Sequence, residues 1–263
     1  MKDLIKLYSF ESVHNTPDEK AIADWICKWL ETHDIMYNRL GNTIYNLEYS
    51  DAPILSAHLD QVKTNGKAVK FYMNDAEKII AFNDKWERTS LGADDKNGVW
   101  IILKALEEGC YINFIISEGE ETGCIGIKKL ENNNTLAAFI DESQFCLVLD
   151  RRGNEDMLSS GGGSTFCSTL AQSLCNFTGQ DFKVTSGSIS DTCTLCNYCE
   201  SVNMSVAYDN PHTANEVTDF KRLKEIKDHV INIVTEFSHY STPTYVYSKT
   251  TYSSRDWREY YGY

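Results

Sequence analysis

The hydrophobic positions of the chain follow two alternating patterns, one with the period of a helix and one made of short, wholly apolar runs. The clearest helical pattern covers residues 16–33. Its apolar residues recur at spacings of three and four, as on one buried helix face: Ile22, Trp25, Ile26, Trp29 and Leu30. Thr16, Pro17 and Glu19 fit an N-cap, a first helical position and a capping box, so the sequence predicts that the helix begins there.

The same two patterns continue to the end of the chain. Further helices are predicted at residues 96–108, 123–131, 163–177 and 219–238. Strands are predicted at residues 43–47, 53–57, 111–116, 145–149 and 202–207. Residues 67–83 alternate weakly and turn at Asn74-Asp75, which indicates a hairpin.

Alternating strands and helices, with several strands apolar on both faces, are typical of a mostly parallel sheet covered by helices on both sides. We therefore expect an α/β fold, a three-layer α/β/α sandwich around a mixed, mostly parallel sheet. No internal repeat and no Pro/Gly/Ser-rich linker divides the chain, so residues 1–239 are predicted to form a single catalytic domain. Residues 240–263 differ, because they hold seven tyrosines and little aliphatic content, and form a separate tail.

Charge and composition exclude several classes of protein. The 263 residues include 25 Lys+Arg and 38 Asp+Glu, a formal net charge of −13, and no basic patch stands out. Such a chain repels nucleic acid and anionic lipid, so neither is an expected partner. No apolar run reaches the length of a membrane span, and no secretory signal is seen. The nine cysteines are read as reduced thiols of a cytoplasmic protein.

Polar residues gather where the predicted strands end, the place where parallel sheets bind ligands. They include two histidines and several carboxylates: His58, Asp60, Asp94, Asp95, Glu118, Glu120, Glu121, Asp150, Asp209 and His212. Taken singly, such residues are more often surface turns, solvated faces or helix caps. Together they form a ligand set suited to zinc, manganese or cobalt.

Five ordered segments of the chain resemble the motif series of di-zinc exopeptidases. They are residues 58–60 (HLD), 92–98 (GADDKNG), 118–123 (EGEETG), Asp150 and 211–216 (PHTANE). The likeness is to peptidase T, to carboxypeptidase-like enzymes and to zinc aminopeptidases. It implies a zinc-exopeptidase-like fold, two zinc ions that manganese or cobalt could replace, and a small peptide as substrate.

The resemblance also implies roles for single residues. Asp94 would bridge two metal ions, His58 and Asp150 would complete one site, and Glu121 and His212 the other. Asp60 would orient the His58 ring, and Glu120 would be the general base. A cis peptide bond is expected between Asp94 and Asp95, as in many relatives.

Two further pairs of residues are candidates for substrate binding. Ser190 and Asp191 lie where similar proteins carry a loop near the substrate; the alternative is that they begin a helical turn. Arg151 and Arg152 directly follow Asp150 and could meet a substrate carboxylate or lie on the outer rim.

The chain also departs from many relatives. They carry an inserted lid, or dimerisation, domain after the residue equivalent to Asp150. Here only 61 residues separate Asp150 from His212. The lid is therefore expected to be absent, or reduced to a helix and a loop.

The leading hypothesis is thus a co-catalytic di-zinc exopeptidase that cleaves a peptide bond near one end of a small peptide. Two alternatives remain open at this stage: a di-metal N-acyl amino acid deacylase or amidohydrolase, and a non-catalytic binding protein that kept the fold. The oligomeric state is not predicted.

Overall fold

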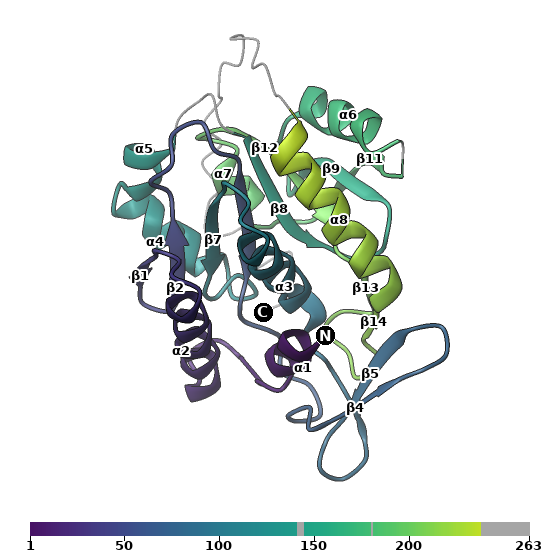
Figure 1. Ribbon diagram of the computed structural model, residues 1–263. Helices are drawn as coiled ribbons and strands as arrows, with labels where there is room; N and C mark the ends of the chain where they lie inside the picture. Colours follow the sequence, from purple (N-terminus) through teal and green to yellow (C-terminus); the bar gives the residue numbers. More distant parts are fainter. Residues whose placement is uncertain (141–144, 180, 238–263) are drawn as a thin grey trace.

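A nine-stranded mixed sheet forms the centre of the protein (Figure 1). The computed structural model describes residues 1–140, 145–179 and 181–237. Four parallel strands occupy the middle of the sheet, in the order β7 (Asn113–Ser117), β3 (Ile54–His58), β8 (Phe145–Arg151) and β12 (Glu200–Ser205). Their side chains are buried almost throughout, because helices cover both faces.

Antiparallel strands extend this parallel centre on both sides. On one side β2 (Thr43–Asn46) pairs with β7, and β1 (Asn38–Leu40) pairs with β2. On the other side β9 (Asp156–Gly161) pairs with β12 and carries β10 (Ser164–Thr165) and β11 (Lys183–Gly187). The predicted mixed, mostly parallel sheet is therefore confirmed.

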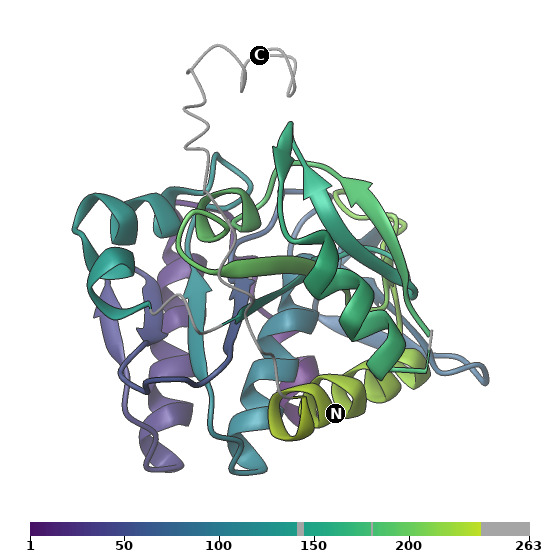
Figure 2. The same ribbon diagram turned by 90° about the horizontal axis from the view of Figure 1, so that it is seen from above.

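The helices form two layers that enclose the sheet (Figure 2). The larger core contains apolar residues of α1 (Lys2–Tyr8), α2 (Pro17–Thr32), α3 (Ala93–Glu107), α6 (Ser168–Phe177) and α8 (Phe220–Glu236). The second core lies under α4 (Ile125–Asn132), α5 (Thr135–Phe139) and α7 (Thr192–Leu195). This arrangement is the three-layer α/β/α sandwich expected from the sequence.

A second, five-stranded sheet stands beside the sandwich. It contains β4 (Lys70–Met73) and β5 (Lys78–Phe82), which confirm the predicted hairpin. β6 (Arg88–Thr89) and β14 (Val217–Asp219) pair with β5, and β13 (Tyr208–Asp209) pairs with β14. Residues 210–216 connect β13 to β14, so this small sheet fixes both ends of the loop that carries His212.

The first predicted helix begins where its capping residues indicate, but with half of the expected capping box. The Thr16 hydroxyl accepts a hydrogen bond from the Glu19 N–H at 3.4 Å. The Glu19 carboxylate does not return to Thr16. Instead it accepts the Asn15 N–H at 3.0 Å and lies 2.8 Å from His14 Nδ1.

The segment between Asp150 and His212 holds more structure than one helix and a loop, and its strands belong to the main sheet. Three strands, β9, β10 and β11, extend the main sheet, and the helix predicted at 163–177 begins only at Ser168 because residues 164–165 form β10. Tyr-rich residues 240–263 lie outside the described residues. Among the described residues, no helix is both long and apolar enough to span a bilayer.

Candidate active site

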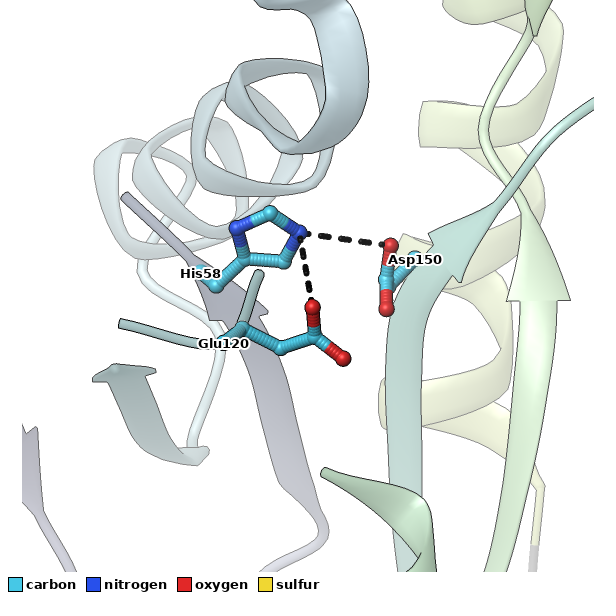
Figure 3. A group of neighbouring side chains, drawn as sticks. All are labelled: His58, Glu120 and Asp150. Atoms are coloured by element: carbon cyan, nitrogen blue, oxygen red, sulfur yellow. Dashed lines mark ion pairs between the residues drawn. The ribbon is translucent and has the colours of Figure 1, made fainter. Parts of the chain in front are cut away.

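The strand ends of the parallel centre bring the predicted ligands together. His58 is the last residue of β3, Asp150 is the second-last residue of β8, and Glu120 and Glu121 lie in the turn after β7. Figure 3 shows His58, Glu120 and Asp150 pointing toward one another from these three strand ends. Parallel strands place their carboxyl ends on one edge of the sheet, which explains why residues so distant in sequence converge.

Asp94 lies between the two histidines of the cluster. Its Oδ1 is 3.2 Å from His58 Nε2, and its Oδ2 is 3.2 Å from His212 Nε2. His212 Nε2 is also 2.7 Å from Glu121 Oε1. One carboxylate thus faces two imidazoles with different oxygens, an arrangement suited to bridging two cations.

The same nitrogen of His58 that faces Asp94 also faces two more carboxylates. Asp150 Oδ1 is 3.5 Å and Glu120 Oε2 is 3.9 Å from His58 Nε2. One ligand atom from each of these three residues lies within 4.8 Å of the others, and the same holds for His58, Asp94 and Glu121. Glu120 is therefore close enough to be a ligand as well as a base, and distance alone does not separate the two roles.

Asp60 supports this cluster through hydrogen bonds and does not border the cavity. Its Oδ1 accepts the Glu120 N–H at 2.9 Å, and its Oδ2 accepts the Glu121 N–H at 3.2 Å. His58 Nδ1 lies 3.1 Å from the Asp60 carbonyl oxygen and 3.4 Å from its Oδ1. A proton on Nδ1 is therefore held by Asp60, which leaves the Nε2 lone pair directed at the other carboxylates.

The position of Asp94 depends on Asp95, which belongs to the predicted cluster, and on Glu216. The Asp94-Asp95 peptide bond is cis, as the resemblance implied. Asp95 is fully buried and accepts the backbone N–H groups of His58 at 3.2 Å and Gly98 at 3.1 Å. Glu216 accepts the Asp94 N–H at 3.2 Å and so connects the end of the His212 loop to the start of α3.

Ser190 and Asp191 do not act as a pair. Ser190 borders the cavity, and its hydroxyl accepts the Thr192 N–H at 3.3 Å, as expected for the start of a helical turn. Asp191 is buried and accepts a hydrogen bond from the Ser117 hydroxyl at 2.5 Å. Of the two residues, only Ser190 therefore borders the cavity.

Burial and neighbouring charges shift the pKa values of the carboxyl groups in the cluster. Burial raises the pKa of Glu120 well above its ordinary value, and the neighbouring charge of Asp150 raises it further. Burial also raises the pKa of Asp150 to about 7, against the opposing effect of His58. The pKa of Asp94 is lowered, because His212 and His58 outweigh the effect of its burial. Carboxylates crowded in this way need a positive partner.

The pKa values of the two histidines are raised, which favours their charged form. Burial by itself would lower the pKa of both histidines. The carboxylates beside His58 nevertheless raise its pKa well above the ordinary value, and Asp94 and Glu121 raise the pKa of His212 to about 10. In the absence of a metal ion, protons on the histidines therefore supply the positive charge that the cluster requires.

The donor set fits a divalent transition metal. Glu121 Oε1 is buried and accepts no hydrogen bond from the residues that the structure describes. His212 Nε2 lies 2.7 Å away, yet its geometry is not that of an N–H donor toward this oxygen. The lone pairs of Glu121 Oε1 and His212 Nε2 repel each other unless both atoms bind the same cation. Imidazole and carboxylate ligands together are those that zinc prefers among hard and borderline donors.

A cavity of about 730 Å³ opens above the cluster. Asp94, Glu120, Glu121, Asp150 and His212 border it. Residues 186–190, at the end of β11 and in the following loop, border it as well, and all but Ile189 have small side chains. This volume lies within the usual range for small-molecule sites.

Comparison with known proteins gives structural matches only. No family model matches the sequence, and no curated protein matches it. A tripeptidase from Staphylococcus aureus superimposes with a TM-score of 0.68 at 16% identity, over 89% of this chain and 96% of that one. The aminopeptidase PepT from Bacillus cereus gives 0.68 at 14% identity, over 89% and 96%.

A third match is the TET1 peptidase from Pyrococcus horikoshii, which can assemble into a tetrahedron or an octahedral shell. Its TM-score is 0.64 at 13% identity, over 89% of this chain and 99% of that one. At such low identities the matches establish a shared fold. They agree with the zinc-exopeptidase-like fold that the sequence motifs implied.

Proposed function

We propose that this protein is a metal-dependent peptidase, a co-catalytic di-zinc exopeptidase that acts on small peptides. The observation that carries the proposal is Asp94, which faces His58 with one oxygen and His212 with the other, each at 3.2 Å. A bridging carboxylate between two imidazoles, surrounded by further carboxylates, suits two metal ions held side by side. The fold shared with peptidases supports the same conclusion.

Five residues would hold the metal ions. His58, Asp94 and Asp150 would form one position, and His212, Asp94 and Glu121 the other. Zinc fits this donor set, and manganese or cobalt could substitute for it. When bound, the metals would supply an activated water and a Lewis acid that polarises the scissile carbonyl.

Glu120 is the carboxylate we assign to proton transfer. It borders the cavity, and burial raises its pKa, which suits a group that accepts a proton and then gives it away. In this role it takes a proton from the attacking water and passes it to the leaving amine. Asp60 holds the Glu120 backbone N–H and the His58 ring, so it positions the base and a ligand at once.

The test is the metal content and peptidase activity of the purified protein. After dialysis and reloading with zinc, we expect about two metal ions per chain by elemental mass spectrometry and hydrolysis of short peptides. Asp94→Ala should lose both. Asp209→Ala is the matched control, because Asp209 ends β13 close to His212 in the sequence but belongs to neither group of candidate metal ligands among the described residues. A wild-type protein that binds no zinc would instead favour the binding-protein hypothesis.

A further inference from the structure

Two arginines border the cavity immediately after Asp150, and the structure gives them different neighbours. Arg151 ends β8, and its guanidinium is engaged by Asp156 of β9, with Nε at 2.9 Å and Nη2 at 2.8 Å from the same carboxylate oxygen. This pair fixes the Arg151 side chain to the sheet. Arg151 is therefore already neutralised and contributes to the cavity wall as a structural element.

Arg152 has no such partner. Its side chain is exposed at the cavity, and no carboxylate of the described residues lies within ion-pair distance of it. The residue is held in place through its backbone, because its carbonyl oxygen accepts the Ser205 hydroxyl at 2.9 Å and the next residue, Gly153, donates its N–H to the Tyr208 carbonyl at 2.7 Å. A fixed backbone thus presents a free guanidinium to the cavity.

The position of Arg152 along the chain limits how far it lies from the reacting centre. Asp150, a proposed metal ligand, precedes it by two residues, so the two Cα atoms lie at most about 7 Å apart. The Arg152 side chain adds its own length to this separation. A group bound by Arg152 would therefore lie within a few residues of the scissile bond.

We propose that Arg152 binds the terminal α-carboxylate of a short peptide substrate. The inference rests on the proposed peptidase function and identifies the carboxyl end of the substrate as the end that this protein recognises. Every unmodified peptide carries one such anion, and a guanidinium binds a carboxylate through two parallel, charge-assisted hydrogen bonds. Among the described residues that border the cavity, Arg152 is the permanently charged cation without an acidic partner.

Arg152 is separate from the carboxylates that also border the cavity. The charge of Asp94, Glu121 and Asp150 would be balanced by the bound metal ions in the loaded protein. The guanidinium would then attract an anion without displacing a metal ligand. A terminal carboxylate held there would orient the peptide, with its carboxyl end at Arg152 and its scissile bond over the cluster.

Three peptides of equal length test the proposal: trialanine, trialanine amide, and Ala-Ala-Asp amide, whose only carboxylate is in a side chain. For the zinc-loaded wild type we expect kcat/KM for trialanine to exceed that for its amide by about tenfold to a hundredfold. Arg152→Ala should remove this preference, mainly through KM, and Arg152→Lys should restore part of it. Lys183→Ala is the control, because it removes an equal charge from neighbouring β11 outside the cavity.

The outcomes separate this proposal from the proposed function. Equal rates for trialanine and its amide in the wild type, or an unchanged preference in Arg152→Ala, would overturn it and leave the peptidase assignment in place. Preference for Ala-Ala-Asp amide over trialanine would also overturn it, since the anion would then come from a side chain.

If no peptide is cleaved, the peptidase assignment fails. The role of Arg152 is then tested by measuring peptide binding instead of hydrolysis. Calorimetry with zinc-loaded Glu120→Gln protein should then show trialanine binding more tightly than its amide. Adding Arg152→Ala should abolish that difference, and a difference that survives the substitution would reject the role of Arg152.

Discussion

Glu120 and Glu121 are consecutive residues with different surroundings. Glu121 Oε1 lies 2.7 Å from His212 Nε2, whereas Glu120 faces His58 from 3.9 Å and borders the cavity. Asp60 accepts both backbone N–H groups, so a single carboxylate sets the direction of both side chains. Adjacent glutamates in this turn can therefore divide metal binding and proton transfer between them.

Replacing Glu120 by glutamine tests the second of these roles. We expect Glu120→Gln to keep its metal and to lose about 10²–10⁴-fold in kcat, the usual contribution of a general base. Glu118→Gln is the control in the same turn, because Glu118 pairs with Lys129 at 2.6 Å and does not border the cavity. Steady-state kinetics with elemental analysis measure both effects. Normal turnover in Glu120→Gln would show that another group carries the proton.

The crowded carboxylates also predict how pH affects stability. In the unfolded chain Asp150 has its ordinary pKa of 3.8, and in the metal-free folded protein its pKa is about 7. The stability that this shift contributes is present below pH 4 and is lost as the pH rises to about 7. The pKa of Asp94 is lowered in the folded protein, so its contribution to stability is already complete at pH 5. The pKa of His212 is raised from 6.5 to about 10, so its contribution is complete below about pH 6.5 and is lost as the pH rises to about 10.

Metal ions replace these protons, and binding releases them. We therefore expect the difference in Tm between zinc-loaded and metal-free protein to increase from pH 5 to pH 8, with the metal-free protein losing stability over this range. Calorimetry with and without a chelator at the two pH values measures the difference. A gap that narrows toward pH 8 would contradict the proposed arrangement of charges.

Most of the proposed ligands could be predicted from the sequence because each directly follows an apolar strand or begins a helix. His58 and Asp150 are examples, whereas His212 was recognised from the motif of residues 211–216. The residues that hold these ligands in place were harder to recognise. Glu216 and Asp95 act through backbone N–H groups of distant residues, and no local pattern in the sequence reveals such a contact.

At the scale of elements, the packing of α3 against β8 determines where Asp94 lies. Gly98 allows this close approach: a Cβ atom there would lie 2.2 Å from the Leu149 carbonyl oxygen and 2.6 Å from Asp95 Oδ1. Neither atom can move easily, because one belongs to the sheet backbone and the other belongs to a carboxylate whose two oxygens each accept a backbone N–H group. The first turn of α3 therefore requires glycine at this position.

Gly98→Ala should consequently displace α3 and weaken metal binding together with stability. We expect a loss of at least about 2 kcal/mol, within the range for overpacked cores. Gly109→Ala is the control at the other end of α3. Its Cβ would meet nothing within 4 Å, so only its positive φ of 77° costs energy, about 1 kcal/mol. Urea unfolding and zinc titration compare the two, and equal zinc affinity in Gly98→Ala would argue against this role of α3.

Long apolar patterns made the major elements predictable, whereas short strands gave no signal. β3, β7 and β8 are buried on both faces and read as continuous apolar runs. β10 and β13 have two residues each, and exposed polar positions dominate β11. Such strands form because a neighbouring strand offers free backbone groups, a cause that lies outside their own sequence.

At the scale of the whole molecule, the N-terminal helix α1 connects distant parts of the fold. Its Tyr8 is fully buried, and its hydroxyl contacts Asn97 Oδ1 of α3 and, at 2.7 Å, Thr218 Oγ1 of β14. Nearby, buried Lys96 donates to the Phe10 carbonyl oxygen at 2.6 Å. The beginning of the chain therefore braces both the start of α3 and the small sheet that holds the His212 loop.

Tyr8→Phe removes only the hydroxyl and leaves buried polar partners behind. We expect it to lower the free energy of unfolding by about 1–3 kcal/mol. Tyr37→Phe is the matched control, because the Tyr37 hydroxyl bonds Glu31 at the exposed surface and its loss should change stability by less than about 0.5 kcal/mol. Denaturant unfolding measures both variants. Equal stabilities would show that the connection through Tyr8 is not needed.

The spread of the cluster along the chain has a consequence for how the protein is made. From His58 to His212 a ribosome must add 154 residues, which takes about 8–30 s at about 5–20 residues per second. β12 pairs with both β8 and β9, so the sheet is incomplete until residue 205 has been synthesised. A nascent chain therefore offers zinc only a partial set of ligands. The complete site can bind its metal ions only after most of the protein has been translated.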